Sequence, residues 1–148
     1  DHGAAGLGLL TSAAGLGALV AGMTKAILPG QIAGRLPKTA LASSLIGIAL
    51  VPVVGFSRSW ELTLALIACL GFAGTISGIS MQTAIQMELD DDLRGRVMSL
   101  WGMVGIGATA AGAIAMGILA DQLGFSAALG STGGLGVLIL GLFLIRIW

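Results

Sequence analysis

Five long apolar stretches, each free of Asp, Glu, Lys and Arg, follow one another along the chain. Each is close to the roughly 20 residues that a helix needs to cross the hydrocarbon of a bilayer. None alternates apolar with polar residues, as the strands of a membrane barrel do. Because a spanning segment must satisfy its own backbone hydrogen bonds, the pattern predicts five transmembrane helices. They cover residues 3–24, 39–57, 62–87, 97–120 and 122–145.

The composition supports a membrane protein rather than a water-soluble one. Hydrophobic residues make up 56% of the 148 positions and charged residues only 9%, whereas a soluble domain averages about 25% charged residues. The formal net charge is zero, which excludes a basic nucleic-acid-binding protein. We therefore expect an all-α membrane protein in contact with the lipid bilayer, without a nucleic-acid partner. Five core helices of a soluble protein, the alternative, would leave too few charges to cover the surface.

Basic residues gather on one side of the five expected spans. Because successive spans reverse direction, the first and third connections and the C-terminal end share a side. Basic connections stay in the cytoplasm, so the pattern places the start of the chain outside and its C-terminal end in the cytoplasm. The side with most basic residues carries Lys25, Arg35, Lys38, Arg94, Arg96 and Arg146, and the other carries Arg58 with Asp1, Glu61 and Asp121.

The third span, residues 62–87, holds most of the polar side chains found within the apolar stretches. Thr75, Gln82 and Gln86 are spaced by seven and four residues, which places them on one helical face. An amide facing lipid is costly, so this face should point toward protein or a water-filled cavity. Two interpretations stay open: the face lines a transport cavity or gate, or it forms hydrogen bonds between helices.

The segment from Glu88 to Val97 is the most densely charged part of the chain. Asp92 is placed to cap the helix that follows, and acidic residues suit the positive end of a helix dipole. Arg94 and Arg96 suit it poorly, so we expect them to have partners. They either form local salt bridges, which contribute little at a surface, or belong to a charge lock that opens and closes with conformation.

Catalytic and metal-binding chemistry is sparse in this sequence. The one cysteine, Cys69, lies in an apolar stretch, and the one histidine, His2, lies at the start of the chain. Neither forms part of a zinc-binding or redox pattern, and no acid pair lies within a span. We therefore expect no enzymatic activity, no cofactor and no metal.

Small residues at four-residue spacing predict close packing between helices in lipid. A proline inside the second span, Pro52, predicts a kink or a weakened turn, while Pro29 and Pro37 are expected in the first connection. The small-residue sets are Ala14–Ala18–Gly22, Gly74–Gly78, Ala108–Gly112, Ala113–Gly117 and Gly130–Gly134.

Three motifs give the chain a family resemblance. Residues 81–86 read MQTAIQ, residues 93–100 read LRGRVMSL, and residues 117–124 read GILADQLG. Together they resemble the C-terminal half of major facilitator superfamily transporters, in the branch of bacterial exporters that includes the enterobactin exporter. The signature positions are Gly95, Gly117, Asp121 and Gly124. The resemblance covers nearly the whole chain and implies helices eight to twelve, an incomplete six-helix C-terminal bundle without the seventh helix and the N-terminal half.

The resemblance also implies a function. It implies a proton-coupled exporter of small amphiphilic molecules such as siderophores or drugs, working by alternating access in the bacterial cytoplasmic membrane. An acid from the N-terminal half would dock at the start of the eleventh helix, so Asp92, Arg94 and Arg96 would form a cytoplasmic charge lock. Helices eight, ten and eleven would line the cavity. The family's loop signature aligns with residues 30–38, where Arg35 is kept but Gly34 and Pro37 replace the usual Asp and Gly.

Two other functions remain open from the residues. Five spans also equal one half of a five-plus-five inverted-repeat symporter, although Pro52 is the sole hint of the broken helix that such a site needs. A non-transporting scaffold subunit, held in an assembly by its small-residue faces, is the other alternative.

Overall fold

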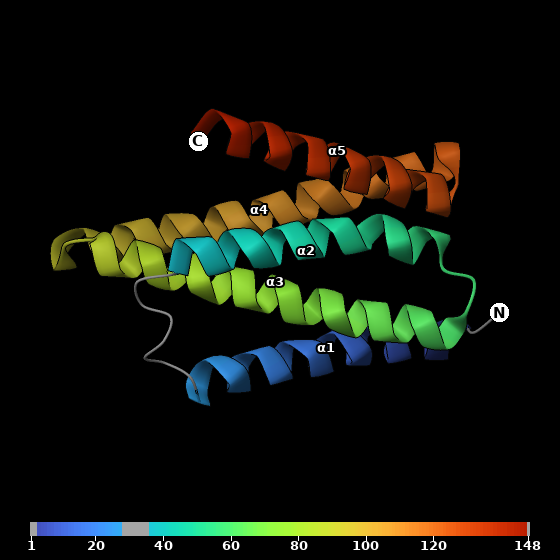
Figure 1. The fold of residues 1–148 in the computed structure, drawn as a ribbon, viewed down its shortest axis with the longest axis horizontal. Helices are drawn as coiled ribbons and strands as arrows, with labels where there is room; N and C mark the ends of the chain where they lie inside the picture. The colour runs from blue at the N-terminus through green and yellow to red at the C-terminus, as the bar shows by residue number, and fades with distance from the viewer. Residues whose placement is uncertain (1–2, 28–35, 148) are drawn as a thin grey trace.

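A computed structural model describes residues 3–27 and 36–147 of the chain. The described residues form five helices and confirm the expected all-α fold (Figure 1). Four of them are long and apolar enough to cross a membrane, and α5 contains a shorter apolar stretch, Phe125–Ile139. The helices are α1 (Gly3–Ile27), α2 (Leu36–Phe56), α3 (Trp60–Glu88), α4 (Asp91–Leu123) and α5 (Phe125–Ile147).

The helix ends differ from the expected spans in two informative places. Helix α4 begins at Asp91 rather than at residue 97, so the charged segment forms its first two turns. Pro37, expected in the first connection, is the second residue of α2, where a proline is tolerated because its nitrogen needs no helical partner. Pro29 lies outside the described residues. Helix α2 runs through Pro52 without a break in its helical residues.

Successive helices run in opposite directions, so α1 and α3 are parallel to each other (Figure 1). Local signals set the sharp turns. The Ser59 hydroxyl caps α3 by accepting a hydrogen bond from the Leu62 amide at 3.1 Å. Helices α4 and α5 are separated by Gly124 alone, which has φ of 83°, a conformation that L side chains rarely adopt. The Gly124 amide donates to the Ala120 carbonyl at 3.0 Å and closes α4.

Helices α1, α3, α2 and α5 pack in that order, and α4 packs mainly on α5. Close approach between backbones, rather than interlocking of large side chains, joins them, as expected where lipid offers no hydrophobic drive between helices. Large apolar side chains such as Leu7, Ile106 and Leu142 stay exposed. Within the described residues, the buried side chains are all small: Ala21, Ala40, Ala73, Ala128, Ser43 and Ser80.

Glycines occupy the tightest crossings, but they are not the glycines that the spacing predicted. A Cβ added to Gly17 of α1 would overlap the Ala68 carbonyl oxygen of α3, and one added to Gly71 would overlap that of Ala14. Between α2 and α5, Gly133 makes room for the Pro52 ring. From the predicted sets, Ala14 lies at such a crossing and Gly130 lies next to Phe56, whereas open space surrounds Gly22, Gly74, Gly78, Gly112, Gly117 and Gly134.

Candidate transport site

The polar face predicted on α3 lies on one continuous helix. At about 100° per residue, Thr75, Gln82 and Gln86 fall within roughly 40° of one another. Gln82 is exposed, and Thr75 and Gln86 are half-buried. No hydrogen bond joins any of the three to another described residue. These side chains are therefore available to a ligand or to a further helix.

A second polar face, on the other side of α3, holds the hydrogen bonds between helices. The Ser77 hydroxyl lies 2.5 Å from that of Ser44 on α2, and it donates to the Ala40 carbonyl at 3.3 Å. The Thr39 hydroxyl donates to Ser80 at 3.3 Å. Ser77 and Ser80 lie outside the face that the spacing of Thr75, Gln82 and Gln86 predicted. The sequence signal for this separate seam was only the presence of hydroxyl residues on both helices, because the facing residues are five apart on α2 and three apart on α3.

Lys25 lies inside α1, two residues before its end, and not in the first cytoplasmic connection as predicted. Its ammonium group turns toward the helix seam and donates to the Ser80 hydroxyl at 2.7 Å. Ser80 is fully buried. Through its hydroxyl, Lys25 near the end of α1 and Thr39 near the start of α2 are both joined to α3. We call these three residues the lysine–hydroxyl cluster. The remaining predicted loop positions from Gly30 to Arg35 lie outside the described residues.

Grooves flank this seam. One of about 450 Å³ lies between α2 and α3, where Ser43, Ser44 and Ser77 add hydroxyl groups to a mainly apolar wall. Another, of about 460 Å³, lies among α2, α4 and α5. Its wall is apolar apart from Thr132, which bonds to its own helix through the Ala128 carbonyl.

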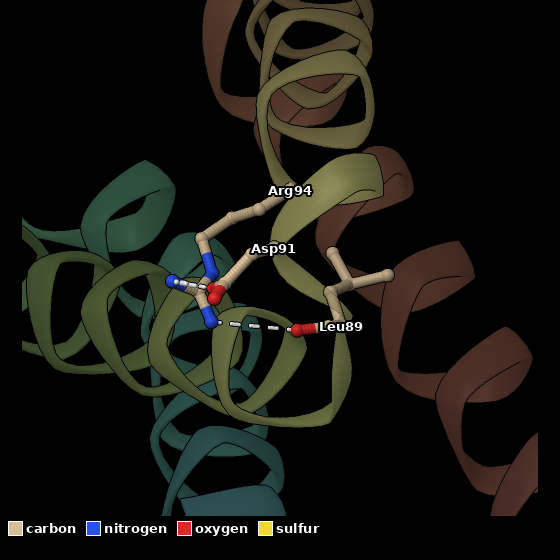
Figure 2. Close-up of polar contacts among 3 residues, drawn as sticks. All are labelled: Leu89, Asp91 and Arg94. Carbon is tan, nitrogen blue, oxygen red and sulfur yellow. Dashed lines mark hydrogen bonds and ion pairs between the residues drawn. The ribbon is translucent and has the colours of Figure 1, made fainter.

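The first turns of α4 carry the predicted charge lock. Arg94 forms an ion pair with Asp91 at 2.9 Å and donates to the Leu89 carbonyl at 3.4 Å, so its head folds back on its own helix (Figure 2). Its side chain is 49% exposed and that of Asp91 is 88% exposed, and such a pair contributes little to stability. Arg96, two residues further on, is exposed and forms no ion pair with a described residue.

Asp92 does not cap α4, so that prediction is wrong. The N-cap residue is Asp90, and Asp92 lies inside the first turn. The Asp90 carbonyl accepts hydrogen bonds from the Leu93 and Arg94 amides, both at 3.1 Å, while its side chain makes no capping bond. The two acids in the first turn, Asp91 and Asp92, still lie where the helix dipole favours negative charge.

The signature residues play unequal parts. Gly124 supplies the turn between α4 and α5, as described above. Asp121 is exposed in the last turn of α4. Gly95 and Gly117 have open space where a Cβ would lie, so no neighbour in the described part of the chain requires glycine there. No group of three His, Cys, Asp or Glu side chains among the described residues could hold a metal ion.

Comparison with known proteins gives consistent matches. The family model described as Major Facilitator Superfamily matches residues 1–148. The enterobactin exporter EntS of Citrobacter koseri is 32% identical over 143 residues, which cover 95% of this chain and 33% of that protein. The exporters of the same name from Escherichia coli O1:K1 and Shigella flexneri are each 27% identical over 144 residues, covering 97% of this chain and 34% of theirs. No solved structure is significantly similar.

Proposed function

Because this chain belongs to the Major Facilitator Superfamily, we propose that it forms part of a secondary active transporter that exports small amphiphilic molecules, of siderophore or drug type, across the bacterial inner membrane. The observation that carries the proposal is the similarity of nearly the whole chain to exporters. The chain spans about a third of the length of these relatives. The five helices then correspond to helices eight to twelve, and the rest of the transporter supplies the other bundle.

The proposed mechanism is alternating access, driven by proton antiport. In this superfamily two six-helix halves move around a site near the middle of the membrane. Helix α4 supports such an arrangement, because its exposed glycines leave room for further helices. Thr75, Gln82 and Gln86 would contact substrate near the gate, since they are free of hydrogen bonds in the described chain. The family architecture leaves no place for the five-plus-five symporter alternative.

The proposed gate lies at the start of α4. Arg96 is the stronger candidate for docking an acid from the other half, because Asp91 already neutralises Arg94. Asp92 lies four residues before Arg96, about one turn of α4, so the two side chains share a face of the helix. The gate is proposed to face the cytoplasm. The C-terminal ends of α1, α3 and α5 then lie on the cytoplasmic side, in keeping with the basic residues near them.

The function can be tested with the full-length transporter in inverted membrane vesicles. An imposed proton gradient should drive uptake of one or more compounds from a panel of siderophores and amphiphilic dyes, and collapse of the gradient should stop it. Vesicles with a Gln82→Leu variant should transport a different subset of the panel. If no compound accumulates under any gradient while the protein is abundant and folded, the exporter proposal is wrong.

A further inference from the structure

Lys25 behaves unlike most lysines near the end of a membrane helix. Long basic side chains there usually extend outward to the aqueous interface. The Lys25 ammonium instead turns inward and donates to Ser80, the most deeply buried of the polar side chains that the structure describes. Thr39 donates to the same oxygen. Two helices therefore converge on one serine of a third, and a positive charge is fixed at that point.

Among the described residues, the fixed charge has only part of the partners that it can bind. An ammonium group has three N–H donors, and one of them bonds to Ser80. No carboxylate forms an ion pair with Lys25 within the described residues. The acid of α3 at this end of the bundle, Glu88, lies eight residues, about 12 Å of helix, beyond Ser80, whereas Lys25 lies near the end of α1 and Lys38 near the start of α2. A half-buried charge in this setting calls for an anion from outside the chain.

The surroundings of Lys25 indicate what kind of anion. It lies two residues, about 3 Å of helix, from the end of α1, which is the depth of the headgroup region for a spanning helix. Met23 and Ile27, each two residues from Lys25, lie on the opposite, outer face of α1 and are 56% and 72% exposed. Helix α1 therefore has an apolar outer face suited to lipid, and a cation at headgroup depth on such a helix matches the anionic head of a lipid.

We propose that the lysine–hydroxyl cluster is a binding site for the phosphate group of an anionic phospholipid, in the leaflet at which α1 ends. Ser80 and Thr39 hold the ammonium in place, and its two remaining donors bind phosphate oxygens. Basic sites between membrane helices bind anionic headgroups in this manner. The inference rests on the membrane placement given under the proposed function, but it does not depend on transport.

The test measures lipid retention by the purified full-length transporter. Protein in nanodiscs of equimolar phosphatidylcholine and phosphatidylglycerol is released into native mass spectrometry, and the bound phosphatidylglycerol is counted. We expect Lys25→Gln to lower phosphatidylglycerol affinity about fivefold, the contribution of one basic residue near an anionic surface. Lys25→Arg should retain it. Arg146→Gln is the matched control, because it removes a basic residue from the last turn of α5 at the same end of the bundle.

The outcomes separate a lipid site from other roles of Lys25. Equal losses in Lys25→Gln and Arg146→Gln would mean general attraction to charge and would overturn the proposal. A melting temperature lowered equally in pure phosphatidylcholine and in the mixture would show that Lys25 only joins helices. Protection of the wild type by inorganic phosphate in phosphatidylcholine nanodiscs would show a soluble anion site instead. Loss of transport with lipid binding intact would bear on the proposed function alone.

Discussion

Helices α3 and α4 both carry several small residues but have opposite surroundings. Helix α3 packs against both α1 and α2 and buries Ala73 and Ser80. Helix α4 is longer, packs mainly on α5 and buries none of its residues. Open space surrounds its glycines at Gly102, Gly105, Gly107, Gly112 and Gly117. The difference shows that small residues become a packing surface only when a partner helix reaches them.

The largest effect should come from the crossing of α1 and α3. We expect Gly71→Ala to lower the stability of the full-length transporter by about 1–3 kcal/mol, because the added methyl overlaps a backbone carbonyl that cannot move aside. Gly74→Ala, on the same helix but facing open space, is the control. Both substitutions raise helix propensity by the same amount. The difference between the melting temperatures of the two variants in detergent therefore measures the effect of the α1–α3 contact alone. Similar melting temperatures for the two variants would contradict the crossing.

The spans could be predicted from the sequence, but the partners within each crossing could not. The gaps between charges identified all five helices, because charge is excluded from hydrocarbon whatever the tertiary fold. The contact between Gly17 and the α3 backbone around Ala68 can be predicted only when it is known that α1 and α3 lie side by side and parallel. Four-residue spacing marks a small face on one helix. It does not tell which of several such faces meets another helix.

The polar residues show the same limit. Gln82 and Ser80 are only two residues apart in sequence, yet a step of two residues turns a helix by about 200° and places them on different faces. Lys25 was assigned to a loop because a charge normally ends a span. Its inward hydrogen bond to Ser80 depends on a neighbour 55 residues away. The turn at Gly124 falls inside the expected fifth span, residues 122–145, because the limits of that span were set by the charge of Asp121.

The next largest effect tests the two arginines at the start of α4. We expect Arg96→Ala to lower export by the full-length transporter about tenfold, equal to about 1.4 kcal/mol, because an acid from the other half loses its partner. Arg94→Ala should lower it much less, since Asp91 already pairs with Arg94. Transport is measured in inverted vesicles at matched protein levels. A larger loss for Arg94→Ala would reverse the assignment of the gate residue.

A smaller effect should separate hydrogen bonds between helices from those within one helix. Ser44→Ala removes the contact with Ser77 across α2 and α3 and should cost about 0.6 kcal/mol, the average for such bonds in a membrane protein. Ser131→Ala is the control, because the Ser131 hydroxyl bonds to Ala128 of its own helix. Thermal unfolding of both variants measures the difference. If Ser131→Ala is as destabilising as Ser44→Ala, the α2–α3 seam contributes no stability of its own.

The smallest effect concerns the ion pair that folds Arg94 back on α4. Asp91→Asn should lower stability by about 0.3–0.5 kcal/mol at low salt, and the difference from wild type should fade as salt screens the exposed pair. Asp92→Asn is the control. It removes an equal negative charge from the first turn, and with it the same favourable interaction with the helix dipole, but it breaks no observed ion pair. The contrast between these variants measures the pair alone. Equal effects at every salt concentration would mean that Arg94 is not held by Asp91, and Arg94 would then be as free as Arg96 to dock at the gate.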